Sequence, residues 1–219
     1  MSFQFPEPRE FKKRTCYKCN RSIEFGEFYF KNKDLPKERL VELWQSENIQ
    51  FYCCLCYDQL INKQQAERLR DQLNEKQKDV LKIIEMKIGR QLPLVPSITY
   101  NSIGFSIRDE DIIGLSLFRT NLYHFPKEII SLNKLESLNL AWNYLEMIPS
   151  SIDSLVSLRE LDLIGNELKI IPESICKLNN LEVIDLSFNN LKTLPECIGE
   201  MKSLCLLKLI KNKITQIPP

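Results

Sequence analysis

The sequence predicts an α/β solenoid with a curved parallel sheet, preceded by a small α+β head and a helical connector. Three observations support this fold class. One pattern of leucine, asparagine and proline returns every 23 residues through the second half of the chain, and a fixed period of this length is typical of a solenoid. Five of the eight cysteines lie between residues 16 and 56. A charged stretch rich in helix-forming residues separates the two regions.

Charge and hydropathy restrict the partners and the compartment. The 219 residues carry 30 basic and 29 acidic side chains, and this balance favours neither nucleic acid nor an anionic membrane as a partner. We find no apolar run with the character of a signal peptide or a membrane span, so we expect a cytoplasmic protein. In that reducing compartment, cysteines are expected to be thiols or metal ligands rather than disulfides.

Shifts in composition divide the chain into segments. We expect a flexible tail at residues 1–13, a zinc-binding head at 14–60, a helical connector at 61–90 and a solenoid of about five repeats at 98–219.

The head contains two Cys-x-x-Cys pairs, separated by about 33 residues. Cys16 and Cys19 form the first pair, and Cys53 and Cys56 form the second. Four thiolates at this spacing are a typical ligand set for one structural Zn²⁺ ion in tetrahedral coordination. Cys54 could replace Cys53 as a ligand, and the alternative to a zinc site is a group of buried free thiols.

The order of elements around these cysteines also carries information. Aromatic, β-prone residues follow the first pair, and a helix-forming sequence begins at the last cysteine. This order resembles the treble-clef zinc finger over residues 14–65. The resemblance implies that the first pair forms a zinc knuckle and that the second pair begins a helix. Residues 31–48 depart from the simplest pattern as an insertion, in which we expect a short helix after Pro36.

Other roles for the head are less compatible with its residues. A catalytic zinc site usually recruits histidine or carboxylate, and the only histidine, His124, lies in the repeats. A ubiquitin-ligase-like role of the RING type would need two zinc ions and eight ligands. Nucleic-acid binding would depend on a short basic cluster, and such a charge run is usually a solvated face. That cluster consists of Lys12, Lys13, Arg14, Lys18 and Arg21.

The connector predicts one long helix, or two helices with a break near Asn74. Val80, Ile84 and Ile88 form its apolar face. We expect this face to cover the first repeat of the solenoid; a coiled-coil dimer is the alternative, with fewer than three clean heptads to support it.

Alternating apolar residues predict a strand between the connector and the repeats. Ile103, Phe105 and Ile107 lie at every second position. This strand is expected to pair with the first repeat strand, through a turn at residues 109–111.

Each repeat is expected to place one strand in the sheet and one helical or 3₁₀ turn on the convex side. In the clearest copy the strand motif is Leu135-x-x-Leu138-x-Leu140. The next asparagine turns the chain, because its amide can bond backbone groups that the bend leaves unpaired. A proline suits the start of each helical turn. The asparagines are Asn143, Asn166, Asn189 and Asn212, with Thr120 in the first copy, and the prolines are Pro126, Pro149, Pro172, Pro195 and Pro218.

This pattern resembles the 23-residue intracellular class of leucine-rich repeats, found in Ras-group and Shoc-type scaffold proteins, over residues 112–219. The resemblance implies protein binding on the concave sheet and often an association with small GTPases or other signalling proteins. Because the chain contains no GTP-binding P-loop, it would be a partner of a GTPase. We therefore expect a non-enzymatic adaptor or scaffold.

Positions between the strand leucines are expected on the concave surface. They combine acidic and large apolar side chains, a composition typical of interface hot spots. In the alternative reading the aromatic rings pack on the strand ends and the acids are simply solvated. The carboxylates recur because one repeat position recurs, so they do not indicate catalysis. The candidate partner-binding residues are Asn139, Trp142, Glu160, Asp162, Asp185 and Phe188.

The last repeats carry three cysteines, Cys176, Cys197 and Cys205. We expect them to be packed in part or exposed, without a chemical role. Solenoid ends usually carry a polar cap. The final repeat shows none, so its leucines should be partly exposed.

Overall fold

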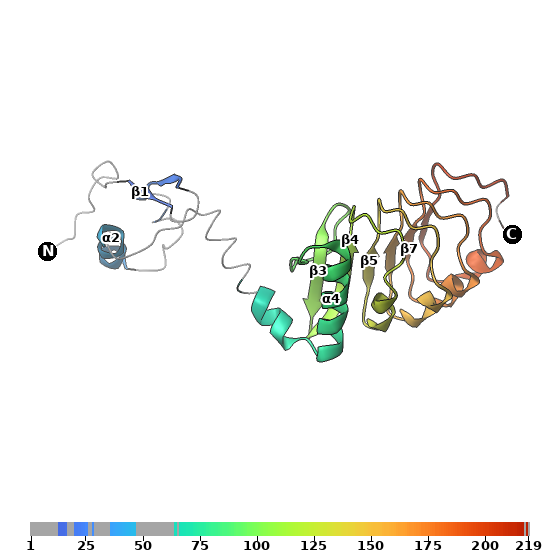
Figure 1. Ribbon diagram of the computed structural model, residues 1–219, viewed down its shortest axis with the longest axis horizontal. Coiled ribbons are helices and arrows are strands. Elements are labelled where there is room, and N and C mark those ends of the chain that lie inside the picture. Colours follow the sequence, from blue (N-terminus) through green and yellow to red (C-terminus); the bar gives the residue numbers. More distant parts are fainter. Residues whose placement is uncertain are drawn as a thin grey trace. The chain divides into compact units, whose positions relative to one another are not determined.

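The computed structural model describes residues 13–16, 20–25, 28, 36–46, 64, 66–216 and 218. Its contacts divide the chain into two units, Met1–Gln65 and Ala66–Pro219 (Figure 1). Each unit has a hydrophobic core of its own.

The described part of the first unit contains a short hairpin and one helix. These elements are β1 (Arg14–Thr15), β2 (Ser22–Ile23) and α2 (Lys37–Gln45). The two strands pair antiparallel, and the N–H of Cys16 donates to the carbonyl oxygen of Arg21 over 2.8 Å to close the turn between them. Helix α2 begins after Pro36 and confirms the short helix predicted there.

The core of this unit forms around Trp44, which is 1% exposed. Arg14 connects the hairpin to the helix, because its guanidinium donates to the carbonyl oxygens of Trp44 (2.6 Å) and Ser46 (3.1 Å) at the end of α2. Lys13 forms an ion pair with Glu24 over 2.9 Å. Two members of the predicted basic cluster are therefore bonded within the unit. The buried core residues are Cys16, Ile23, Phe25, Leu40 and Trp44.

The second unit begins with two helices rather than one. Residues 66–72 are helical, and α4 (Glu75–Ile88) follows after a break. Asn74 is the N-cap of α4, because its side-chain oxygen accepts the N–H of Gln77 over 3.0 Å. A new helix therefore starts after the break. Gly89 ends α4 in the left-handed conformation at φ 69°.

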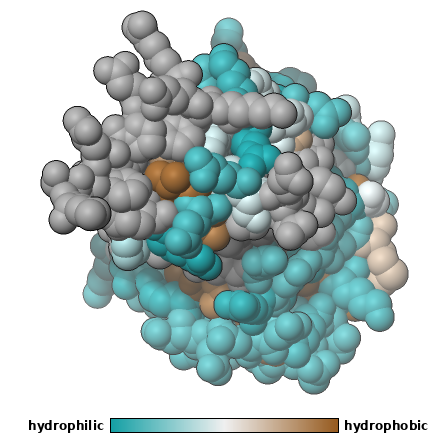
Figure 2. Space-filling view, turned by 90° about the vertical axis from the view of Figure 1, so that its left-hand side faces the viewer, coloured by the Kyte–Doolittle hydropathy of each residue, from teal (hydrophilic) through white to brown (hydrophobic). Residues whose placement is uncertain are grey.

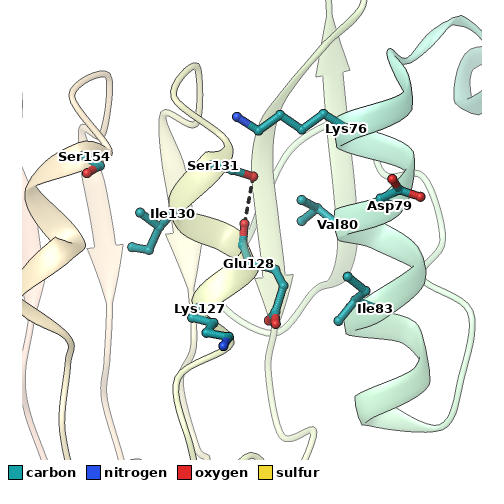
Figure 3. Close-up of a pocket in the computed structure, with 9 residues that line it drawn as sticks. All are labelled: Lys76, Asp79, Val80, Ile83, Lys127, Glu128, Ile130, Ser131 and Ser154. Carbon is teal, nitrogen blue, oxygen red and sulfur yellow. Dashed lines mark hydrogen bonds between the residues drawn. The ribbon is translucent and has the colours of Figure 1, made fainter.

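Helix α4 packs against the first repeat. Val80, Leu81 and Ile84 are at most 5% exposed and belong to the same core as the repeat leucines. The helix lies beside the first 3₁₀ turn (Figure 3), so it continues the convex layer of the solenoid with a longer element.

The sheet of this unit has six strands in the order β3-β4-β5-β6-β7-β8. β3 and β4 form an antiparallel hairpin around Asp109 and Glu110, and every later pair is parallel. The predicted parallel sheet therefore has one antiparallel edge strand. The strands are β3 (Ile103–Arg108), β4 (Asp111–Leu117), β5 (Ser137–Asn139), β6 (Glu160–Asp162), β7 (Val183–Asp185) and β8 (Leu206–Lys208).

Short 3₁₀ turns form the convex layer, one for each of the first four repeats (Figure 1). Each begins directly after a proline, which fixes φ and has no N–H to leave unpaired. The turns are η2 (Lys127–Ser131), η3 (Ser150–Ser154), η4 (Glu173–Lys177) and η5 (Glu196–Glu200).

The repeated asparagines bond neighbouring repeats together. Oδ1 of Asn166 accepts the N–H of Leu145 over 3.0 Å, and its Nδ2 donates to the carbonyl oxygens of Leu140 and Leu163 at 3.0 Å. Thr120, at this position in the first repeat, donates to Leu117 of its own repeat over 2.8 Å. The equivalent amide bonds are made by Asn143, Asn189 and Asn212.

The repeat leucines and isoleucines form one continuous hydrophobic core. On the face drawn in Figure 2 the described residues are mostly hydrophilic. The leucines of the last strand region, Leu204, Leu207 and Leu209, are partly exposed, as predicted. Within the described ranges, no helix is both long and apolar enough to cross a membrane.

Candidate functional site

The concave face carries two rows of side chains in register across the parallel strands. Leu138, Leu161 and Ile184 point into the core, so the residues on either side of them face outward. One row is Gly114, Ser137, Glu160, Val183 and Leu206, and the other is Ser116, Asn139, Asp162, Asp185 and Lys208.

The chain covers the first part of this face with its own residues 95–102. Ser116 donates to the carbonyl oxygen of Ser102 over 2.6 Å. Ile98 lies so close to Gly114 that a Cβ there would approach its side chain to 2.7 Å, so this position has room only for glycine. This covering segment was not predicted, because it lies outside the repeats and has no period of its own.

Asn139 is one of the residues beneath this segment. It is 3% exposed, and its Nδ2 donates to the carbonyl oxygens of Thr99 (3.3 Å) and Tyr100 (3.1 Å). Its Oδ1 accepts the N–H of Ala141 over 2.9 Å. The amide of Asn139, one of the predicted partner-binding residues, thus already binds the chain's own backbone in this structure.

An acidic hollow remains open beside the covering segment, with a volume of about 250 Å³. Asp162 and Asp185 each accept a backbone N–H two residues further along the chain, at 3.1 and 2.9 Å. These bonds fix both carboxylates at the strand ends. Lys208 lies 3.4 Å from the second oxygen of Asp185, and Glu160 is exposed at the rim. The hollow therefore brings together the three predicted carboxylates, with the buried Asn139 also in its lining.

Asp162 has an unusual pKa in this hollow. Burial raises its pKa to about 6, and the carboxylate of Asp185 adds to this rise. The N–H of Ile164 and the ammonium of Lys208 act in the opposite direction. A cationic side chain beside Asp162 would favour the ionised carboxylate and lower its pKa again.

One position shortly after each strand has the same backbone conformation in every repeat, and two aromatic residues at this position, Trp142 and Phe188, form what we call the aromatic edge. Residues at this position adopt left-handed φ values between 50° and 66°. Trp142 and Phe188 occupy it on two repeats, and their ring centroids are 6.0 Å apart, on either side of Gly165. Phe188 is 44% exposed. The five equivalent residues are Arg119, Trp142, Gly165, Phe188 and Lys211.

The covering segment also supports this edge. Tyr100 accepts the indole N–H of Trp142 over 3.3 Å, and its ring lies 6.0 Å from that of Phe118. The guanidinium of Arg119 lies 5.3 Å from the ring centroid of Phe118 and 5.4 Å from that of Trp142, within range of a cation–π contact with each. These contacts hold Trp142 in place while Phe188 stays open to solvent.

The side chains of the hollow are bonded within the repeats, and no histidine lies among the residues that line it. Asp162 and Asp185 each accept a backbone N–H, Glu160 accepts the hydroxyl of Ser137, and His124 is exposed in a loop before η2. Nothing in this arrangement indicates a nucleophile with an adjacent base.

A second hollow, of about 590 Å³, lies between α4 and the convex turns (Figure 3). Val80, Ile83 and Ile130 form its apolar floor, and Lys76 reaches over it from the helix. It is the junction between the cap and the first repeat.

The predicted zinc ligands are only partly within the described residues. Cys16 is buried at the start of the hairpin turn, whereas Cys19, Cys53, Cys54 and Cys56 lie outside the described ranges.

The cysteines of the convex side form a disulfide, which corrects the expectation of unpaired thiols. Cys176 on η4 is bonded to Cys197 on η5, with 6.0 Å between their Cα atoms. Cys176 follows the core residue Ile175, and Cys197 precedes its equivalent Ile198. Their side chains therefore meet between the two turns. A spacing of 21 residues, slightly under one period, was the available signal.

Comparison with known proteins identifies the repeats. Residues 134–155, 157–178 and 180–201 each match the family model of the Leucine Rich Repeat. These segments contain strands β5, β6 and β7 with their convex turns. A search of curated proteins gives no match.

The solved structures similar to this chain include an LRR ectodomain and an LRR protein. The ectodomain of the plant receptor kinase GASSHO1/SCHENGEN3 from Arabidopsis thaliana, in complex with CASPARIAN STRIP INTEGRITY FACTOR 2, is 26% identical, with a TM-score of 0.47 over 55% of this chain and 15% of that chain. A protein of Leptospira interrogans is 31% identical, with a TM-score of 0.37 over 52% of this chain and 33% of that one. A chain of the BIR3–SERK2 complex from Arabidopsis thaliana is 31% identical, with a TM-score of 0.48 over 57% of this chain and 69% of that one. This chain thus spans well under two thirds of the first two proteins.

Proposed function

We propose that this chain, a leucine-rich repeat protein, is a non-enzymatic cytoplasmic adaptor that binds a protein partner on the open part of its concave face. Leucine-rich repeats generally mediate protein–protein interaction. The proposed surface consists of the acidic hollow and the aromatic edge.

One observation carries this proposal: an aromatic pair, of which Phe188 is exposed and Trp142 partly exposed, lies beside fixed carboxylates on the sheet. Phe188 and Trp142 offer apolar area at a low cost in side-chain entropy. Asp162 and Asp185 are held by backbone bonds, so binding would not need to order them. Such preorganised mixtures of aromatic and charged groups are typical of interface hot spots.

The chemistry of the surface indicates the kind of partner. Three carboxylates face a single ammonium group, that of Lys208, so the hollow is suited to a lysine or arginine side chain. The aromatic edge is suited to an apolar residue next to that cation. A small GTPase or another signalling protein with such a segment is the partner class that the sequence resemblance implies.

Substitutions on the face would test the proposal. A partner captured from the native cell would be purified, and its affinity measured for Trp142→Ala and Asp162→Lys. We expect a loss of about 30-fold or more for each, the effect of removing a hot-spot residue worth about 2 kcal/mol.

Two matched substitutions away from the face serve as controls. Tyr123→Ala removes an aromatic ring that is 64% exposed, and Glu167→Lys reverses an exposed charge. Both should leave the affinity within about twofold. If the partner binds Trp142→Ala and Asp162→Lys as tightly as the wild type, the concave-face proposal is wrong.

The proposal includes one structural Zn²⁺ ion in the head, held by Cys16, Cys19, Cys53 and Cys56. What supports it is the position of Cys16, buried in a hairpin turn that suits a zinc knuckle. The ion would stabilise a small unit with few buried apolar residues. Chelation should unfold the head, as followed by the fluorescence of Trp44, and an unchanged signal would contradict the zinc site.

A further inference from the structure

We infer that Glu173, Cys176 and Cys197 form a redox-controlled binding site for a thiophilic divalent cation such as Zn²⁺, on the convex side of the solenoid. The disulfide is the oxidised form of this site, and the metal-binding form is the reduced one. This site is separate from the head cysteines and from the concave face.

The first observation is the position of a carboxylate against the sulfur atoms. Oε2 of Glu173 lies 3.0 Å from Sγ of Cys197, and the backbone carbonyl oxygen of Glu173 lies 3.7 Å from the same sulfur. One oxygen and both sulfurs all lie within 4.8 Å of one another. A sulfur in a disulfide has no proton to donate, so this contact satisfies no hydrogen bond in the oxidised form.

The second observation is that the backbone already holds these groups together. Glu173 and Cys176 belong to the same turn, η4, and Cys197 lies on the adjacent η5. Both turns are fixed by their prolines and by the core residues Ile175 and Ile198. Reduction would separate the sulfurs by a small side-chain rotation and leave the two turns in place.

The ligand set suits zinc. Two thiolates and one carboxylate together carry three negative charges, which a divalent cation can offset, and all three groups are ordinary zinc ligands. A fourth position would be open to water, because Glu173 is exposed and both cysteines are partly exposed. Within the described residues, this is the one group of three or more such side chains close enough to share an ion.

The pair of turns that precedes this site, η3 and η4, is linked without cysteines. There the positions equivalent to Cys176 and Cys197 are held by Asp153 and Ser174, and Asp153 forms an ion pair with Lys177 over 3.2 Å. A charged pair thus links η3 to η4. Between η4 and η5, a disulfide or a metal ion would make the same connection.

The two forms interconvert by balanced chemistry. Two glutathione thiols reduce the disulfide in two exchange steps, which yield two cysteine thiols and one molecule of glutathione disulfide. Zn²⁺ then replaces the two thiol protons, which are released to solvent. In the reverse direction, glutathione disulfide oxidises the two cysteine thiolates to the disulfide and is reduced to two glutathione thiols, and the metal ion is released.

Metal counting on the full chain tests the inference. The reduced wild type, equilibrated with Zn²⁺ and freed of excess, should bind one ion more than Cys176→Ser, measured by native mass spectrometry. Oxidation by glutathione disulfide should lower the wild-type count to that of the variant. Cys205→Ser, which removes an exposed thiol elsewhere in the repeats, is the matched control and should keep the wild-type count.

A second variant separates loss of the site from loss of folding. Glu173→Ala keeps both thiols, so it should still form the disulfide, while its zinc affinity should fall by tenfold or more. Equal zinc counts for the reduced wild type and Cys176→Ser would overturn the inference, whether or not the head binds zinc. An unchanged affinity in Glu173→Ala would overturn the role of the carboxylate.

Discussion

The indole ring of Trp142 lies against Gly165, its equivalent in the next repeat, with no room for a side chain between them. A Cβ at residue 165 would come within 2.7 Å of the ring. The other repeats carry Arg119, Phe188 and Lys211 at this position, with φ values between 50° and 58°. The left-handed backbone therefore does not by itself require glycine here. The ring of Trp142 does.

We expect Gly165→Ala to destabilise the solenoid by about 1–3 kcal/mol, the usual cost of an overpacked contact. It should also displace Trp142 from the aromatic edge and weaken partner binding. Urea unfolding would measure the stability, and tryptophan fluorescence would report the displacement. In a Trp142→Ala background the same substitution should cost much less, and an equal cost would show that the ring is not the cause.

The asparagine bonds between repeats predict a larger effect. Asn166→Ala leaves one buried N–H and two buried carbonyl oxygens without their side-chain partner. Because each unpaired buried group costs about 1–3 kcal/mol, we expect a loss of at least about 3 kcal/mol in chemical denaturation. Thr120→Ala is the control, with an expected loss of about 1 kcal/mol. Equal losses would contradict a special role for the amide.

These features differ in how far the sequence alone could predict them. The same sequence pattern recurs in each repeat, and it predicts the strands, the asparagine bonds and the two concave rows. Asp162 and Asp185 could therefore be placed on one face. The convex turns could be placed from their prolines. Local periodicity was sufficient for all of these.

Features that depend on contacts between dissimilar segments could not be predicted in this way. Asn139 has the sequence position of a concave-face residue, but residues 95–102 cross over it and take its amide bonds. Cys176 and Cys197 are not equivalent in the repeat, so the period alone does not pair them. Their meeting depends on the geometry of two neighbouring 3₁₀ turns.

The capping role of α4 leads to a third prediction. Ile84 is fully buried against the first repeat, and Met86, on the same helix, is 65% exposed. Ile84→Ala should cost about 2–5 kcal/mol of unfolding free energy, the range for large-to-small core substitutions. Met86→Ala should change it by less than about 0.5 kcal/mol. If both variants unfold like the wild type, the helix does not stabilise the solenoid.

The disulfide should contribute to stability in the oxidised chain. Closing a loop of this length restricts the unfolded state and is worth about 3 kcal/mol. Cys197→Ser should therefore lower the unfolding free energy of the oxidised protein by about that amount. In metal-free reducing conditions the wild type and this variant should unfold alike. A difference that persists there would mean that the serine itself, rather than the lost crosslink, is destabilising.

The raised pKa of Asp162 predicts a dependence of stability on pH. Its pKa is about 6 in the folded chain and about 3.9 in an unfolded one. The folded state therefore holds this proton more tightly, and the stability that the group contributes falls as pH rises from about 4 to about 6. Relative to wild type, Asp162→Asn should gain stability across this interval, measured by urea unfolding at each pH. Glu167→Gln, at an exposed position, should show no such trend.

The same carboxylate should make partner binding depend on pH in the opposite direction. Asp162 faces Asp185 on β7 and Lys208 on β8, so at pH 5 it is largely protonated and offers little charge to a cationic side chain. Above pH 6 the carboxylate of Asp162 is ionised, and a bound cation would stabilise this ionised form. Affinity should thus rise from pH 5 to pH 7 in the wild type, and the rise should be smaller in Asp162→Asn. Binding that is equally strong across this range in the wild type would mean that the partner presents no cation to the hollow, and would leave the aromatic edge as the main contact.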